Sequence, residues 1–79
     1  MYKRQVADPA ALLAIVEQRY AANALTVEKI DGLGMEFSEW RFNLRMSNTE
    51  PVVRLNVEAR EDHALMIEKT QELLALIDA

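Results

Sequence analysis

The chain has 79 residues, of which 51% are hydrophobic, enough for the core of one small domain and no more. A net charge of −4 argues against general nucleic-acid binding, which requires a basic surface, and the absence of cysteine excludes disulfides, thiol nucleophiles and zinc–thiolate sites. No apolar run approaches the roughly 18 residues of a membrane-spanning helix, and no cleavable signal is visible at Met1. We therefore expect a cytoplasmic protein with no nucleic-acid or membrane partner.

The charge is unevenly distributed along the chain. Residues 41–60 hold four arginines against two glutamates, whereas residues 61–79 hold five acidic residues against one lysine. A small basic region in an acidic protein indicates a small anionic ligand rather than a polyanion.

The N-terminal part predicts a linker followed by a helix. Residues 1–7 are short and polar and are expected to be a linker remnant, with the domain spanning 8–79. Asp8-Pro9 is typical of a helix start, because Asp caps the first turn and Pro suits its first position. The helix is expected to reach about Ala22 and to end at Asn23, with an apolar stripe at Leu12, Leu13, Val16 and Tyr20.

The middle of the chain predicts antiparallel strands. Residues 24–30 contain enough β-branched residues to predict a strand, and Asp31-Gly32 is a hairpin-turn signal. Residues 33–37 alternate between apolar and other residues, as in a half-buried strand. The alternation resumes out of phase at residues 40–44, which implies a bulge or short break at Ser38-Glu39.

The strand after this break pairs with residues 52–58 in a predicted hairpin. A loop over residues 46–51 places Arg45 opposite Val52, so that the two apolar rows coincide: Leu44 with Val53, Phe42 with Leu55, and Trp40 with Val57. A shift of one residue would instead set polar side chains against the apolar row.

A second helix closes the chain. Glu61 and Asp62 open it, with Asp62 as the expected cap, and its apolar stripe is Met66, Thr70, Leu73, Leu74 and Ile77. The fold class predicted is α+β, in the order α-β-β-β-β-α. It has two layers, an antiparallel sheet of about four strands with both helices on one face.

No complete catalytic set is present in the sequence. The single His63 has no nearby Ser or Cys partner and is read as a surface residue. Glu61 and Asp62 are better explained as helix-start residues than as general acids or metal ligands. The chain by itself is not expected to be an enzyme.

The segment from Arg45 to Pro51 predicts a phosphate site. Arg45 offers a planar, permanently charged fork on the face opposite the apolar row, and its neighbours add hydroxyl and amide donors: Ser47, Asn48 and Thr49. Pro51 stiffens the loop exit, and Glu50 should point away from a phosphate or hold an arginine. The alternative is a simple turn-forming loop, with Arg41 and Arg54 as ordinary exposed strand residues.

The stretch over residues 40–58, WRFNLRMSNTEPVVRLNVE, resembles the final domain of the α-D-phosphohexomutases and is most similar to their bacterial phosphomannomutase/phosphoglucomutase branch. The resemblance is looser over residues 8–37 and the last helix. In that family an Arg-x-Ser-(Gly or Asn)-Thr loop binds the phosphate of the sugar, which implies phosphate contacts for Arg45, Ser47, Asn48 and Thr49. Met46 stands where the family more often has a small residue.

The resemblance implies a parent enzyme of four domains that interconverts hexose 1-phosphate and hexose 6-phosphate through a bisphosphorylated intermediate. In such enzymes a phosphoserine lies in the first domain, Mg²⁺ in an Asp-rich loop of the second, and a sugar-recognition loop in the third. None of these motifs is visible in this sequence, so we expect an excised fourth domain with an artificial start at Met1. Its partners would be mannose or glucose phosphates and the other three domains. The family's fourth domain has a fold likened to the TATA-binding protein, which implies no nucleic-acid role.

A second hypothesis remains open: a free-standing α+β module that binds a protein partner. Its surface would be the acidic second helix, with Glu61, Asp62, Glu68 and Glu72.

Overall fold

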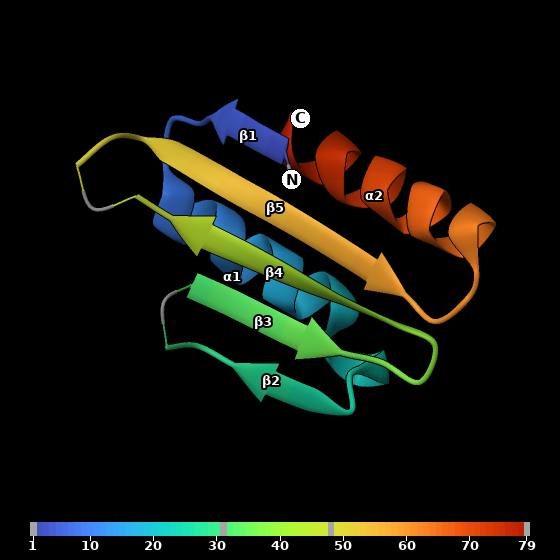
Figure 1. Ribbon diagram of the computed structural model, residues 1–79. Coiled ribbons are helices and arrows are strands. Elements are labelled where there is room, and N and C mark those ends of the chain that lie inside the picture. The colour runs from blue at the N-terminus through green and yellow to red at the C-terminus, as the bar shows by residue number, and fades with distance from the viewer. Residues whose placement is uncertain (1, 31, 48, 79) are drawn as a thin grey trace.

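The structure, a computed structural model, describes residues 2–30, 32–47 and 49–78. In these residues a five-stranded antiparallel sheet in the order β1-β5-β4-β3-β2 carries two helices on one face (Figure 1). The elements are β1 (Tyr2–Gln5), α1 (Pro9–Tyr20), a 3₁₀ turn (Ala21–Asn23), β2 (Thr26–Glu28), β3 (Gly32–Glu36), β4 (Trp40–Met46), β5 (Val52–Ala59) and α2 (His63–Ile77). The predicted two-layer α+β fold is confirmed, including the four strands between the helices.

Both helices begin at the predicted residues. The Asp8 carboxylate accepts a hydrogen bond from the Ala11 N–H at 3.2 Å, and Asp62 accepts one from the Leu65 N–H at 2.9 Å. Each cap satisfies an N–H group that has no partner within its own helix. The first α-helix ends at Tyr20 rather than Ala22, and the 3₁₀ turn carries the chain on to Asn23.

One hydrophobic core lies between the sheet and the helices. Most of the strand residues predicted to alternate inward are buried, together with part of both helix stripes: Leu12, Val16, Tyr20, Leu33, Met35, Phe37, Trp40, Phe42, Leu44, Val53, Leu55, Leu73 and Ile77. Because all these side chains leave the sheet on one side, the other face of the sheet stays uncovered (Figure 1). Four predicted core residues are only partly buried: Leu13, Val57, Met66 and Leu74.

An aromatic cluster closes one end of this core. The Tyr20 ring lies edge-on to Trp40 at 5.6 Å between centroids, and its hydroxyl donates a hydrogen bond to the Glu72 carboxylate at 3.0 Å. Burial, reinforced by this hydrogen bond, raises the pKa of Tyr20 above its ordinary value. The Lys69 ammonium lies 5.4 Å from the Trp40 ring. The cluster therefore ties α1, α2 and β4 together.

The interpretation of residues 1–7 as a linker that forms no element is wrong for Tyr2–Gln5. These residues form β1, which pairs antiparallel with β5 and sets Tyr2 opposite Leu55 and Gln5 opposite Val52. The segment is polar because β1 is a short edge strand with exposed side chains. Its partner lies about fifty residues away along the chain, which a local pattern does not reveal.

The predicted register of the β4–β5 hairpin is also wrong, by two residues. Phe42 lies opposite Val57, Leu44 opposite Leu55, and Arg45 opposite Arg54 rather than Val52. Since side chains repeat every two residues, a shift of two keeps every residue on its face, so the apolar rows match equally well in both registers. The observed register is additionally favoured by charge, because it sets Arg41 opposite Glu58.

The other predicted strands are present with changed bounds, and Met46, predicted to lie in the loop, is the last residue of β4. The first predicted strand, residues 24–30, is reduced to Thr26–Glu28. The break at Ser38-Glu39 is a reversal of the chain between β3 and β4, where the Phe37 N–H donates to the Trp40 carbonyl at 2.8 Å. Of the predicted turn at Asp31-Gly32, Asp31 lies outside the described residues.

Candidate functional site

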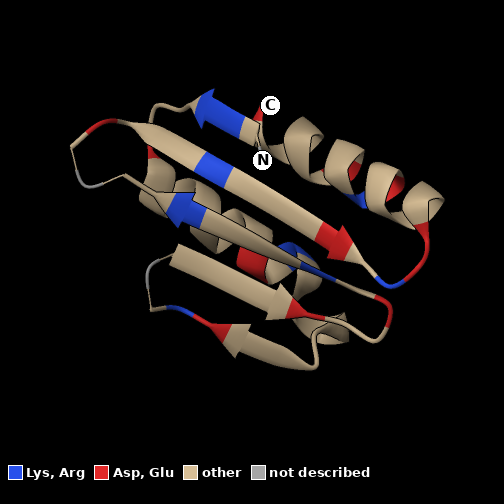
Figure 2. Ribbon diagram, viewed as in Figure 1, with Lys and Arg blue, Asp and Glu red and all other residues tan. Residues whose placement is uncertain are grey.

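The uncovered face of the sheet carries a basic row near the β4–β5 loop. Arg45 on β4 lies directly opposite Arg54 on β5, and Arg54 in turn lies opposite Lys3 on β1. All three side chains are exposed. Figure 2 shows basic residues on these three neighbouring strands. The prediction that Arg45 faces away from the core is confirmed.

The loop after β4 places two hydroxyls beside this row. Ser47 follows Arg45 by two residues, so their side chains leave the same face. Its Oγ lies 3.4 Å from Thr49 Oγ1 and accepts a hydrogen bond from the Thr49 N–H at 3.3 Å. Ser47 and Thr49 thus contact each other directly after the strand that carries Arg45. Asn48, the fourth predicted phosphate contact, lies outside the described residues.

Backbone hydrogen bonds hold both ends of the loop. The Ser47 N–H donates to the Val52 carbonyl at 3.1 Å, which extends the β4–β5 ladder by one pair. At the exit, the Val6 N–H just after β1 donates to the Pro51 carbonyl at 2.8 Å. Glu50 is exposed and makes no ion pair with any of the residues that the structure describes. The N-terminal strand therefore supports the loop that the sequence singles out.

Gly32 positions the backbone beneath Arg45. It is the Cα partner of Arg45 across β3 and β4 and has a φ of 136°, which favours glycine. A Cβ at this position would lie 2.9 Å from the Arg45 Cα and would also collide with the Leu44 carbonyl. Any side chain here would push β4 away at the residue that carries the guanidinium.

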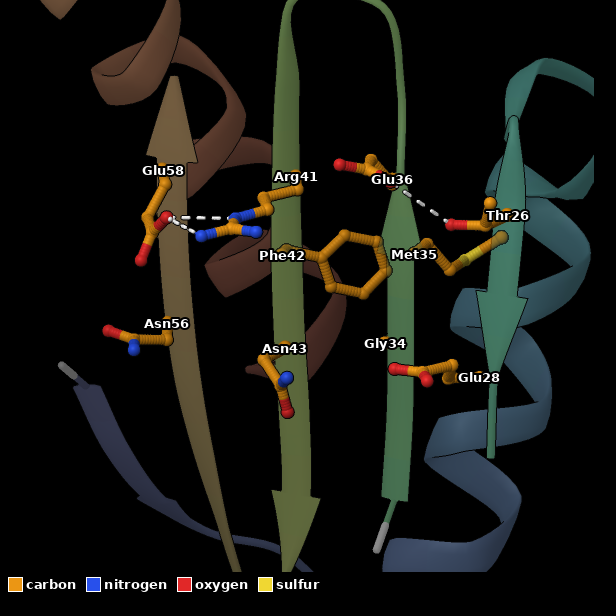
Figure 3. A pocket seen from close by; sticks show the side chains of 10 residues that line it. All are labelled: Thr26, Glu28, Gly34, Met35, Glu36, Arg41, Phe42, Asn43, Asn56 and Glu58. Carbon is orange, nitrogen blue, oxygen red and sulfur yellow. Dashed lines mark hydrogen bonds and ion pairs between the residues drawn. The ribbon is translucent and has the colours of Figure 1, made fainter. Parts of the chain in front are cut away.

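Arg41, four residues before Arg45, is engaged differently. Its guanidinium contacts Glu58 across the strands, with Nη2 2.6 Å and Nε 2.8 Å from the same carboxylate oxygen (Figure 3). The hydrogen bond to Glu58, helped by its charge, raises the pKa of Arg41 above its ordinary value. Arg41 is therefore an ordinary paired surface residue, as the sequence indicates.

Two shallow cavities follow one another along this face. One, of about 260 Å³, is lined by Asn43, Arg45, Arg54, Leu55 and Asn56. The next, of about 280 Å³, shares the two asparagines and continues over Gly34 towards Glu28 and Glu36 (Figure 3). The face thus passes from a basic end beside the loop, through an amide pair, to an acidic end.

Sequence reasoning missed the place of Arg54 in this arrangement. It treats Arg54 as an ordinary exposed residue because the predicted register sets it opposite Asn43. The signal that could have found it is the Arg41–Glu58 charge pair, since the register that joins those two residues also sets Arg54 against Arg45.

The described part of the chain shows neither a metal site nor a membrane-spanning helix. Residues 2–30, 32–47 and 49–78 contain no group of three or more His, Asp or Glu side chains that could hold a metal ion. Over those ranges, no helix has both the length and the apolar character to cross a membrane. His63 is exposed at the first residue of α2.

Residues 1–75 match the family model described as phosphoglucomutase/phosphomannomutase, C-terminal domain. The chain belongs to this family. It is 57% identical over 74 residues to a phosphomannomutase of Salmonella typhimurium and 51% identical over 74 residues to one of Escherichia coli, with 94% of this chain covered in each case. It is also 45% identical over 73 residues, 92% of its length, to a protein of Xanthomonas campestris named phosphohexose mutases.

Membership of the phosphoglucomutase/phosphomannomutase family confirms the resemblance seen at residues 40–58. The chain spans 16% of the length of each of these relatives. It corresponds to the C-terminal domain of an isomerase family. The roles of Arg45, Ser47, Asn48 and Thr49 stay predictions at this point.

Proposed function

We propose that this chain is the substrate-phosphate-binding domain of a phosphomannomutase/phosphoglucomutase. The parent enzyme would interconvert hexose 1-phosphate and hexose 6-phosphate through a bisphosphorylated intermediate, in the cytoplasm. The observation that carries the proposal is the exposed Arg45 beside the hydroxyls of Ser47 and Thr49, on the sheet face that the helices leave open.

The chemistry of these groups suits a phosphate monoester. Such a group carries close to two negative charges near neutral pH and has three strong acceptor oxygens. Arg45 can donate two parallel hydrogen bonds to two of those oxygens, and hydroxyls or backbone N–H groups can satisfy the third. Because Ser47 and Thr49 already hold each other in a turn, their order before binding lowers the entropy cost of holding the ligand.

In the reaction the domain would bind and orient the substrate rather than transform it. The loop would hold the phosphate distal to the transferring serine of another domain, and Mg²⁺ would be bound by residues outside this chain, where it would neutralise the transferring phosphoryl group. Reorientation of the bisphosphorylated intermediate would bring each of its two phosphates into the loop in turn. The open face leaves room for the other three domains to meet the ligand.

The alternative module that binds proteins through α2 has less support. Asp62 is used as the cap of α2, and Glu72 accepts hydrogen bonds from both Tyr20 and Lys69. Half of the four-residue acidic surface therefore already has a structural role.

The test is a titration of the ¹⁵N-labelled chain with inorganic phosphate and with mannose 6-phosphate. We expect the amide signals around Arg45, Ser47 and Thr49 to shift first, and Arg45→Ala to weaken binding about tenfold or more, as expected for loss of a charged fork. Arg60→Ala, which removes the same charge beyond the far end of β5, is the matched control. Shifts confined to α2, or none at millimolar ligand, would contradict the proposal.

A further inference from the structure

Exposed aliphatic side chains gather along β2, the outermost strand of the sheet on the side away from β1 (Figure 1). Leu25 is 68% exposed, Val27 42% and Ile30 82%. The other exposed large hydrophobic residues each lie on a different element of the described chain: Tyr2, Ile15, Met46 and Ile67. Apolar side chains that are exposed as a group, rather than singly, are typical of a surface that binds another protein.

The backbone at the centre of β2 faces the open edge of the sheet, beyond which the structure describes no further strand. In an antiparallel sheet, the N–H and C=O groups of successive residues point alternately to one neighbouring strand and to the other. The Phe37 N–H bonds to the Trp40 carbonyl, so odd-numbered residues of β3 point to β4 and even-numbered ones to β2. Their partners on β2 are Thr26 and Glu28, so the backbone groups of Val27 point outward.

The two edges of the sheet are unequally protected against pairing with another strand. Natural sheets guard an open edge with charged side chains, above all lysine. The edge strand β1 carries Lys3 and Arg4 at its centre, so pairing with a second β1 would set like charges against each other. On β2, by contrast, the central residue is apolar, and the next lysine, Lys29, is drawn back to α1, where its Nζ lies 2.7 Å from the Glu17 carboxylate.

We propose that β2 pairs antiparallel with β2 of a second copy of this chain, about a two-fold axis at Val27, so that the two five-stranded sheets become continuous. This inference goes beyond the proposed function. It uses a surface that β3 separates from the basic row on β4, β5 and β1.

The residues of β2 are complementary to themselves in this arrangement. With Val27 opposite its own copy, Thr26 lies opposite Glu28, so a hydroxyl faces a carboxylate and no like charges meet within the strand. Just beyond the strand, Leu25 lies opposite Lys29. Because the charged end of that lysine is held by its own α1, its methylene stem is left to pack against the leucine.

The size of the contact determines its strength. A strand of three residues with two flanking aliphatic side chains buries well below the roughly 1,200 Å² of a stable interface. We therefore expect a weak dimer, with a dissociation constant on the order of 0.1–1 mM. Such a dimer is populated at the concentrations used for NMR spectroscopy.

The experiment measures translational diffusion and amide shifts of the 79-residue chain by NMR between about 0.05 and 2 mM. We expect slower diffusion at high concentration, with the largest shifts at residues 25–30. Val27→Lys should weaken the association about tenfold, because it removes an apolar contact and sets like charges against each other. Ile67→Lys is the matched control, since Ile67 on α2 is 43% exposed, and it should change the association by less than about twofold.

Mixing two variants tests the two-fold axis itself. Val27→Lys and Val27→Glu should each be monomeric alone, whereas an equimolar mixture should associate, because opposite charges then face each other. Retained dispersion of the amide spectrum shows that each variant is folded. Wild-type diffusion that is independent of concentration would overturn the proposal, and so would an effect of Ile67→Lys as large as that of Val27→Lys. A mixture that stays as monomeric as its components would exclude pairing of β2 with itself.

Discussion

Replacing Arg54 by glutamate tests whether basic residues that face each other on this sheet, and would favour an anion, lower the free energy of unfolding. In the wild-type chain Arg54 faces the like charge of Arg45. Glutamate at this position would reproduce the relation of Arg41 to Glu58, in which the charged groups approach to 2.6 Å. We predict that Arg54→Glu raises the free energy of unfolding while it removes measurable phosphate binding.

The magnitude follows from the cross-strand relation. Each favourable or unfavourable charge pair directly opposite in a sheet is worth roughly 0.2–1 kcal/mol. The substitution turns two unfavourable pairs of Arg54, with Arg45 and with Lys3, into two favourable ones. Since all three residues are exposed, solvent screening keeps the sum at about 1 kcal/mol. For a domain of this size that corresponds to a rise in Tm of about 4–8 °C.

The assay is urea and thermal unfolding, followed by circular dichroism and by the fluorescence of the buried Trp40, at low salt and in 1 M sodium chloride. Arg60→Glu is the matched control, because it changes the net charge by the same amount without a facing arginine in the described strands. The advantage of Arg54→Glu should shrink at 1 M salt, where the Debye length falls to about 3 Å.

Two results would refute this reasoning. The first is that Arg54→Glu is no more stable than Arg60→Glu at low salt, which would mean that the facing arginines do not destabilise the fold. Alternatively, a stability gain that is unchanged in 1 M salt would have a cause other than charge.

Two further predictions concern residues that support the site and the core. Gly32→Ala should lower the free energy of unfolding in urea by about 1–3 kcal/mol, because the added methyl group would collide with the Leu44–Arg45 backbone at a residue with positive φ. The phosphate affinity of the variant should fall as well. A wild-type free energy of unfolding together with a wild-type phosphate affinity would contradict this prediction. Tyr20→Phe should flatten the alkaline loss of stability. Below pH about 10 tyrosine is protonated in both states, but above it the unfolded chain ionises while Tyr20, whose pKa is raised, stays protonated, so the wild-type free energy of unfolding falls as pH rises. Urea unfolding at pH 8 and pH 11 measures the difference between the two chains, and equal losses in both would count against it.

The sequence by itself determined the parts of this domain that depend on local chemistry. Asp8 and Asp62 cap helices where their side chains can reach free N–H groups three residues on. The alternation of apolar and polar residues predicted which face of each strand is buried. It therefore also predicted that Arg45 points away from the core. The same stretch carried enough of the family pattern to identify the domain, because residues 40–58 combine that alternation with the Arg-Met-Ser-Asn-Thr loop.

Tertiary structure decided which residues meet across the sheet. Alternation has a period of two, so it cannot distinguish two registers that differ by two residues, and only pairing along the whole hairpin set Arg54 against Arg45. The strand Tyr2–Gln5 could not be predicted from its own residues. It forms hydrogen bonds with a strand that is distant in sequence, and as an edge strand it needs no apolar pattern of its own. The loop could thus be predicted from its own residues, whereas the basic row beside it exists only because the β4–β5 register and the distant strand β1 place three basic residues side by side.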